Sequence, residues 1–229
     1  MFHLIYNPRW FFGKDIYVDL VSVIVLFMIA FFSYRYYGLS KRKKYAIFST
    51  SFLLMAVSFI FKIVTNFTLY HQKLETKTFG LITYTYSTLQ QSDILFQLGF
   101  LFHRLLMLFG LYLLYSIYAK PKKGTSFLIF YLIVVSTIFM RSAYFIFHLS
   151  SLILLILISL YYIKNYKKSY NNKLLFTSFL TIILSQLLFM FIKFDLTLYI
   201  VAEFVQLLAY IVLLITIIRV LKDGKKRKK

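Results

Sequence analysis

Long, uninterrupted apolar segments recur along the whole chain, and they limit its fold more than any other feature of the sequence. Runs of about 18 or more apolar residues are long enough to cross a hydrocarbon core about 30 Å thick as a helix. Lipid offers no partners for backbone polar groups, so each segment must satisfy its own hydrogen bonds, as a helix does. A transmembrane barrel would show short segments of alternating polarity instead. The sequence therefore predicts an all-α polytopic membrane protein.

Seven predicted membrane-spanning helices account for these segments. They cover residues 16–36, 45–69, 94–118, 125–140, 142–163, 173–193 and 196–220. The chain has 229 residues, of which 61% are hydrophobic, so we expect a single transmembrane domain over residues 1–229 and no separate soluble domain. The first helix is followed by a basic segment and not by a small-residue cleavage site, so we expect it to be retained.

Basic residues lie on one side of the predicted bundle. They account for a formal net charge of +20 and follow the first, third, fifth and seventh helices, in residues 41–44, 120–123, 164–173 and 222–229. Loops rich in lysine and arginine stay in the cytoplasm, so we expect a cell-membrane protein with its N-terminus outside and its C-terminus inside. The charge is a topology signal, and we expect no nucleic-acid partner. The tail is also a candidate site for anionic lipid or an acidic protein, formed by Lys225, Lys226, Arg227, Lys228 and Lys229.

Two parts of the chain, residues 16–118 and 142–220, share short similar segments. FSTSFLLMAVS at residues 48–58 corresponds to FTSFLTIILSQ at residues 176–186, and NFTLY at residues 66–70 corresponds to FDLTLY at residues 194–199. If residues 125–140 form a linker helix, the two triplets of helices have the same orientation. The sequence therefore predicts a parallel 3+1+3 repeat.

This plan resembles the seven-helix architecture of microbial rhodopsins, of SWEET and PQ-loop transporters, and of the sensor regions of prokaryotic signalling proteins. The resemblance covers the whole chain and rests on helix number and repeat alone. Rhodopsins carry a retinal-binding lysine within the last helix, whereas the predicted last helix here, residues 196–220, contains no lysine before Lys222, which follows it. The transporters carry prolines in their helices, whereas Pro8 and Pro121 lie outside them. We expect no retinal and no other cofactor. Abundant lysine, isoleucine, phenylalanine and tyrosine suggest an AT-rich prokaryotic or archaeal genome.

Polar side chains inside the predicted helices gather in the outer half of the membrane and share helix faces. In the last helix four of them follow an i, i+4, i+7, i+11 spacing: Tyr199, Glu203, Gln206 and Tyr210. A second stripe, in the helix at residues 45–69, consists of Ser51, Ser58, Lys62 and Asn66. Polar groups that face lipid are costly, so the stripes are expected to converge inside the bundle.

The converging side chains predict a polar pocket that opens to the outside. In the third helix His103 lies on one side with Gly99 and Gly110, which permit a close helix contact. Asp19 and Asn66 lie nearer the outer ends of their helices and are left out of the set. We expect Glu203 to face Lys62 or Arg104. The candidate ligand-binding residues are Lys62, Gln97, His103, Arg104, His148, Gln186, Glu203 and Gln206.

Each of these residues also has a structural interpretation. Glu203 would then be half of an ion pair that fixes helix register, and both histidines would be hydrogen-bonded interior groups. His103, His148 and Glu203 have metal-ligand chemistry, but the sequence contains no HxxxH or HExxH pattern. We predict no metal site, no catalytic residue and no enzymatic activity. The enzymatic alternative is an intramembrane metal-dependent hydrolase.

Three functions remain open. The first is a sensor or receptor-like protein in which a small polar ligand or a proton enters from outside, and the cytoplasmic side signals to a separate membrane or cytoplasmic partner. The second is a small solute or ion transporter. The third is a non-catalytic membrane scaffold or assembly subunit. The outer loop, residues 71–93, is expected to be a strand-like or re-entrant lid over the bundle, or a surface loop on the lipid headgroups.

Overall fold

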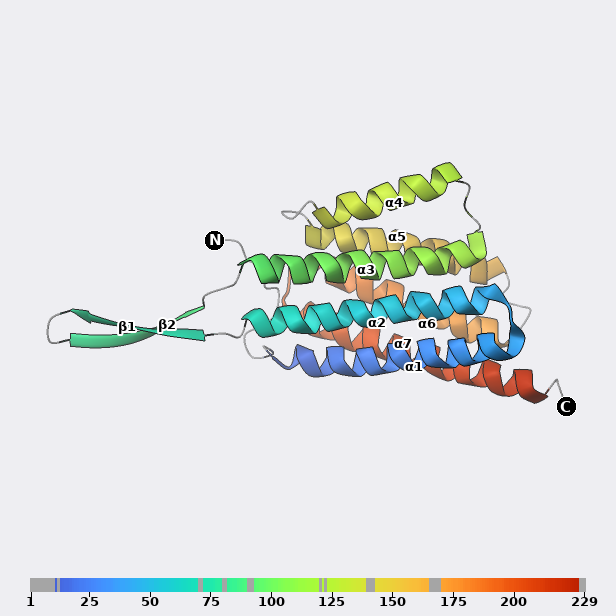
Figure 1. The fold of residues 1–229 in the computed structure, drawn as a ribbon, viewed down its shortest axis with the longest axis horizontal. Coiled ribbons are helices and arrows are strands. Elements are labelled where there is room, and N and C mark those ends of the chain that lie inside the picture. The colour runs from blue at the N-terminus through green and yellow to red at the C-terminus, as the bar shows by residue number, and fades with distance from the viewer. Residues whose placement is uncertain are drawn as a thin grey trace.

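The computed structural model contains seven helices and one β-hairpin among the residues that it describes (Figure 1). These are residues 11, 13–69, 72–79, 82–89, 93–119, 121, 123–138, 143–164 and 170–226. Only the backbone is described for residues 67–69, 72–79, 82–89, 93–97, 143, 164, 170–172 and 221–226. The helices are α1 (Asp15–Ser40), α2 (Lys43–Leu69), α3 (Asp93–Ala119), α4 (Lys123–Ile138), α5 (Ala143–Lys164), α6 (Tyr170–Met190) and α7 (Thr197–Lys226).

Each of the seven predicted helices is confirmed, but one of them is too short to count as a clear membrane span. Six helices, all except α4, are long and apolar enough to cross a membrane. The 16 residues of α4 correspond to a length of about 24 Å, which is less than a hydrocarbon core about 30 Å thick. The prediction of an all-α, multi-pass membrane protein is therefore confirmed with six candidate spans. The helix predicted over residues 125–140 is a shorter apolar helix that ends at Ile138.

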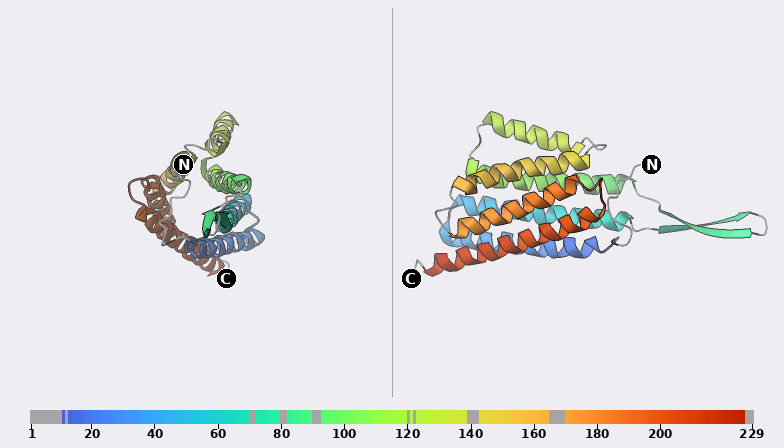
Figure 2. Two further views of the ribbon diagram at one scale, coloured as in Figure 1. Left: turned by 90° about the vertical axis from the view of Figure 1, so that its left-hand side faces the viewer. Right: turned by 180° about the vertical axis from the view of Figure 1, so that it is seen from behind.

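The six long helices form a closed ring. Contacts follow the order α1, α2, α3, α5, α6, α7, and the ring closes because α7 packs against α1. The end-on view in Figure 2 shows this arrangement, in which α4 lies outside the ring. The packing partners of α4 are α3 and α5. Each long helix therefore has one side toward the interior of the ring, and α4 is not needed to close it.

Two glycines allow α2 and α3 to pack closely. A Cβ atom at Gly110 would lie 2.9 Å from the carbonyl oxygen of Ser51 on α2. A Cβ atom at Gly99 would lie 2.0 Å from Oγ1 of Thr65, also on α2. A larger residue at either position would separate the helices or displace these side chains, so the predicted role of the two glycines is confirmed.

The hairpin consists of β1 (Gln72–Phe79) and β2 (Ile82–Leu89), which pair antiparallel from Gln72 opposite Leu89 to Phe79 opposite Ile82. The sequence of β2, ITYTYSTL, is rich in the β-branched and aromatic residues that favour strands. Figures 1 and 2 show the hairpin projecting along the long axis of the bundle, away from the helices. The strand-like alternative is thus confirmed at residues 72–79 and 82–89, whereas a lid over the bundle is wrong. We call this end of the bundle, where α1, α3, α5 and α7 begin, the hairpin end, and the end where α7 finishes the tail end.

Two apolar clusters form the core of the bundle. The larger one contains residues of all seven helices, among them Leu26, Phe52, Leu108, Ile133, Leu155, Phe179 and Leu213. The smaller one contains Phe11, Val18, Phe189, Ile192, Tyr199 and Ala202. Lys62 touches both clusters, since its Nζ atom lies 5.6 Å from the ring centre of Phe59 in the larger and 5.8 Å from that of Tyr199 in the smaller. The buried charges therefore lie between two apolar layers.

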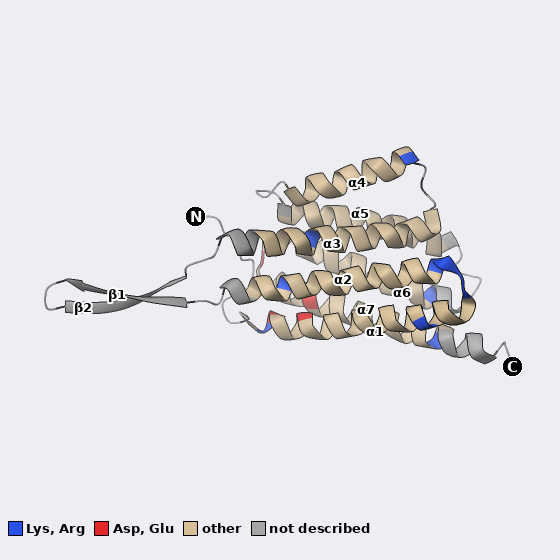
Figure 3. Ribbon diagram, in the orientation of Figure 1, with Lys and Arg blue, Asp and Glu red and all other residues tan. Residues whose placement is uncertain are grey.

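Charged side chains are distributed unevenly between the two ends. Figure 3 shows most of the described lysines and arginines at the tail end and the acidic residues toward the hairpin end. The basic residues at the tail end include the exposed run at residues 41–44, which covers the turn after α1 and the first two residues of α2 (Figure 3). The side chains of the predicted lipid or protein site, Lys225 to Lys229, lie outside the described residues.

Candidate functional site

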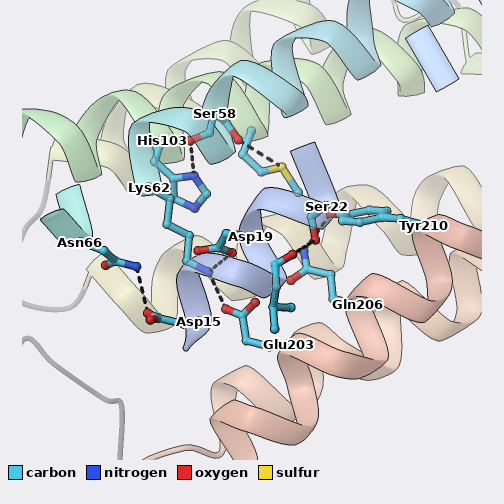
Figure 4. A network of polar contacts seen from close by, with 12 residues as sticks. Asp15, Asp19, Ser22, Ser58, Lys62, Asn66, His103, Glu203, Gln206 and Tyr210 are labelled. Carbon is cyan, nitrogen blue, oxygen red and sulfur yellow. Dashed lines mark hydrogen bonds and ion pairs between the residues drawn. The ribbon is translucent and has the colours of Figure 1, made fainter. Parts of the chain in front are cut away.

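A buried ionic triad joins three helices in the hairpin-end half of the ring (Figure 4). The Nζ atom of Lys62 on α2 lies 2.8 Å from Oδ1 of Asp19 on α1 and 2.5 Å from Oε1 of Glu203 on α7. The side chains of Lys62, Asp19 and Glu203 are 12%, 0% and 2% exposed, respectively. We call these three residues the triad. Protein atoms enclose it almost completely, and it links α1, α2 and α7 through charge rather than through apolar contact.

Helical spacing explains how α1 and α2 supply two polar contacts to the same region. Asp15 lies one turn before Asp19 on α1, and Asn66 lies one turn after Lys62 on α2. Because the two helices are antiparallel neighbours, the four side chains meet as two successive pairs. The Nδ2 group of Asn66 donates a hydrogen bond of 2.9 Å to Oδ2 of Asp15, and Lys62 pairs with Asp19. The pairs fix the register of α1 against α2.

The predicted stripe on α7 faces the interior of the ring. Tyr199, Glu203, Gln206 and Tyr210 are all buried. One turn below the triad, the Nε2 group of Gln206 donates a hydrogen bond of 2.8 Å to the hydroxyl oxygen of Tyr210. Tyr210 packs edge-on against Phe59, with ring centres 6.1 Å apart. Tyr210 is therefore both the last residue of the polar stripe and a member of the larger apolar cluster.

His103 on α3 is a hydrogen-bonded interior residue. Its Nδ1 atom lies 2.9 Å from the carbonyl oxygen of Ser58 on α2. A carbonyl oxygen only accepts, so Nδ1 carries the hydrogen and donates it. The imidazole packs edge-on against Phe59 at 5.8 Å between ring centres and lies at the same distance from Phe147. These contacts support the structural interpretation of His103.

His148 on α5 has its own partner and is separate from the triad. Its Nδ1 atom lies 2.8 Å from Oε1 of Gln186, which joins α5 to α6. The ring stacks on Phe189 with centres 4.7 Å apart and contacts Tyr144 at 4.4 Å. Phe147 contacts both histidine rings. Sequence reasoning named both His148 and Gln186 but did not pair them with each other.

The remaining predicted site residues have different outcomes. Arg104 on α3 is buried, and its guanidinium carbon lies 5.4 Å from the ring centre of Phe100. Of the two predicted partners of Glu203, the structure selects Lys62. The side chain of Gln97 lies outside the described residues. Within the part of the chain that the structure describes, no three histidine or acidic side chains come together in a group that could hold a metal ion.

Asp19 is the functional candidate that sequence reasoning missed. Counting residues from the predicted helix end placed Asp19 nearer the outer surface than Lys62, but the two side chains are in direct contact. Lysine has a long flexible stem, so its charged group reaches a level different from that of its backbone. The sequence contains a signal for this pairing. Asp15 and Asp19 are spaced i, i+4 on one helix, and Lys62 and Asn66 have the same spacing on its antiparallel neighbour.

The triad contains more acidic than basic groups. Two carboxyl groups share one lysine, and the second oxygen of Asp19, Oδ2, is buried without a hydrogen-bond partner among the described residues. Removing a charge from water costs several kcal/mol in a protein interior unless an opposite charge compensates it. Any process that changes the charge of the triad therefore changes how strongly α1, α2 and α7 attract one another.

Comparison of the chain with protein-family models, with curated proteins and with solved structures finds no match. The resemblance to rhodopsins and to SWEET and PQ-loop transporters thus extends to a seven-helix, all-helical bundle with six candidate spans and no further. Functional inference rests on the geometry of the triad and its surroundings.

Proposed function

We propose that this chain is a sensor or receptor-like membrane protein whose stimulus acts at the triad. One observation carries the proposal: an enclosed cluster of ionisable groups, Asp19, Lys62 and Glu203, ties together three helices at the hairpin end. A small polar ligand or a proton that changes the charge of this cluster favours one packing of α1, α2 and α7 over another. The change is then read by a separate membrane or cytoplasmic partner at the tail end.

The proposed direction of signalling follows from the distribution of charge. By the positive-inside rule the basic tail end is cytoplasmic, so the N-terminus and the hairpin end are outside. The described helices α1 to α7 contain no proline, so they have no proline kink and transmit a displacement along their length. The exposed basic residues 41–44 lie where α1 ends and α2 begins, two of the three helices that the triad connects, and form a suitable surface for an acidic partner.

A solute or ion transporter is the second candidate, and the order of the helices favours it. Helices α1 to α3 are successive neighbours, as are α5 to α7, and α4 lies outside. This arrangement is compatible with a parallel 3+1+3 repeat. The apolar core below Tyr210 and the absence of proline from the helices argue against a continuous path between the two ends.

A membrane scaffold is the third candidate. The direct pairing of Glu203 with Lys62 favours it, because an ion pair of this kind also serves a purely structural role.

Spin-label distances test the proposed sensor. The chain has no cysteine, so a double variant with Gly38→Cys on α1 and Ile215→Cys on α7 carries labels at two defined tail-end positions. A Cβ atom at Gly38 meets no described atom within 4 Å, and Ile215 is 46% exposed. Electron–electron resonance distances are measured in lipid nanodiscs across a range of pH and with a panel of small polar solutes. We expect the distance distribution to shift with at least one of these stimuli.

The matched control carries the same labels and the neutral triad Asp19→Asn, Lys62→Met, Glu203→Gln, in which the shift should be lost. An unchanged distribution under every condition contradicts the sensor and supports the scaffold. Uptake of labelled solutes into proteoliposomes that is lost in Glu203→Gln would identify a transporter instead.

A further inference from the structure

We propose that the triad holds one exchangeable proton, carried as a carboxylic acid by Asp19 or Glu203. This inference rests on the proposed function only for its consequence, since it names the proton as the stimulus of the sensor. The protonation itself is a property of the site. A hydronium ion at the hairpin end breaks one of its O–H bonds and leaves as water, a carboxylate oxygen forms the new O–H bond, and the net charge of the triad changes from −1 to zero.

The acidic and basic groups of the triad are not equal in number. Lys62 contacts both carboxyl groups, at 2.8 Å to Asp19 and 2.5 Å to Glu203, and it can neutralise only one of them. Both acids are almost fully buried. The remaining negative charge lies between two apolar layers and is poorly solvated, so binding of a proton is favoured over leaving the charge uncompensated.

The two carboxyl oxygens of Asp19 have different surroundings. Lys62 occupies Oδ1, whereas Oδ2 is buried and has no hydrogen-bond partner among the described residues. The residue itself is 0% exposed. An ionised carboxylate in an interior normally accepts hydrogen bonds on both oxygens. A carboxyl oxygen in this position is the one at which a proton adds without breaking an existing contact.

Several charged and titratable groups on α1, α2 and α7 face Asp19. Its own helix contributes Asp15, which accepts a hydrogen bond from Asn66 and increases the local negative charge. From α2 comes Lys62, and from α7 come Glu203 and the buried Tyr199, whose ring lies 5.8 Å from Nζ of Lys62. The main packing partners of α1 are α2 and α7. Arg104 belongs to α3, whose main partners are α2, α4 and α5.

A proton suits this site better than a metal cation does. A sodium or calcium ion needs several oxygen ligands around it. Nζ of Lys62 already occupies the position between the two carboxyl groups, and its positive charge repels a second cation. A proton requires only one oxygen atom, and Oδ2 of Asp19 supplies it.

Infrared spectroscopy of the full chain in nanodiscs tests the proposal. The C=O stretch of a protonated carboxylic acid is separate from that of a carboxylate and shifts in heavy water. In the wild-type protein near neutral pH we expect a band that corresponds to one buried acid. The band should be absent in Asp19→Asn and also in Glu203→Gln, because either substitution leaves one carboxylate balanced by one lysine. In Lys62→Met its intensity should double, because two acids then lack a counter-charge.

The matched control is Asp15→Asn, which removes a neighbouring buried acid outside the triad. The band should remain, and it should be lost at a lower pH than in the wild type because a nearby negative charge is gone. The wild-type spectrum decides the question even if a variant fails to fold. No band at any pH at which the protein stays folded overturns the proposal, as does a band that survives both Asp19→Asn and Glu203→Gln. A band that sodium abolishes and choline restores overturns it in favour of a metal cation.

The two proposals fail in different ways. A wild-type band together with fixed spin-label distances keeps the proton site and contradicts the sensor. Moving distances without a band keep the sensor and contradict the proton site.

Discussion

The two halves of the helix ring satisfy their buried polar groups differently. Toward the tail end, hydroxyl groups donate to backbone carbonyl oxygens, as Ser33 does to Ile29 at 2.7 Å and Thr216 does to Val212 at 2.8 Å. Each of these bonds lies within one helix and carries no formal charge. Toward the hairpin end, Lys62 bonds two acids on two other helices. Neutral bonds also join helices, as between Tyr118 and Tyr162 and between His148 and Gln186, but the charged bonds of the triad concentrate sensitivity to pH in the hairpin-end half.

The largest effect is expected from breaking the coupling itself. In Lys62→Met, two buried carboxyl groups lose their counter-charge, and we expect the free energy of unfolding to fall by about 3–5 kcal/mol, the typical result of removing one partner of a buried ion pair. Unfolding in mixed detergent micelles measures it. Adding Asp19→Asn and Glu203→Gln to Lys62→Met should recover most of the loss. A loss under about 1 kcal/mol for Lys62→Met, as for a surface ion pair, would show that the triad does not couple the helices.

A smaller effect is expected where packing alone joins two helices. In Gly110→Ala the new Cβ would lie 2.9 Å from the carbonyl oxygen of Ser51 and 2.9 Å from Cγ of Met55. We expect a loss of about 1–3 kcal/mol, the usual cost of overpacking, measured by the same unfolding assay. Gly38→Ala is the matched control, because its Cβ meets no described atom within 4 Å and alanine favours a helix. If both variants unfold alike, the close contact of α2 and α3 is not a constraint.

A still smaller effect is expected from a neutral bond between helices at the tail end. The hydroxyl groups of Tyr118 on α3 and Tyr162 on α5 are hydrogen-bonded to each other. Tyr162→Phe removes this bond and should cost about 1 kcal/mol. The loss should be the same at every pH between about 5 and 8, in contrast to variants of the triad, because neither phenol ionises there. Tyr34→Phe, at a position 64% exposed, is the control with little expected change. A pH-dependent loss would contradict the division into a neutral and an ionic half.

The smallest effect is expected at the exposed turn between α6 and α7. The backbone N–H of Thr197 donates a hydrogen bond of 2.8 Å to Oδ1 of Asp195, and this bond lowers the pKa of Asp195 below its ordinary value. A lowered pKa stabilises the fold above the ordinary aspartate range, and this contribution is lost as pH falls through the lowered value. Asp195→Asn should therefore be slightly less stable than the wild type at neutral pH, and the difference should vanish in acid. Unfolding midpoints at several pH values check this, and a difference that grows in acid would contradict it.

Helix positions and buried faces were the features that the sequence predicted best. Apolar segments about as long as the membrane is thick leave few alternatives to helices. Because polar groups are costly in lipid, Glu203 was predicted to face the interior and Lys62, and it does. Asp19 was missed because a count of residues along a helix ignores the reach of a lysine side chain. The partners of the histidines depended on which neighbouring carbonyl or amide came within bonding distance, as with Ser58 and His103. The direction of the hairpin depends on how the chain leaves α2, which strand propensity does not specify.

The hairpin also limits where the lipid can lie. Each of its two strands pairs only with the other, so along both outer edges alternate N–H and C=O groups face away from the sheet. Hydrocarbon cannot satisfy these groups, whereas water can. With eight residues in each strand, the hairpin spans about 27 Å at 3.4 Å per residue, and this whole length must stay in the aqueous phase. The boundary of the bilayer at this side therefore lies no farther out than the helix ends, within a few turns of the triad.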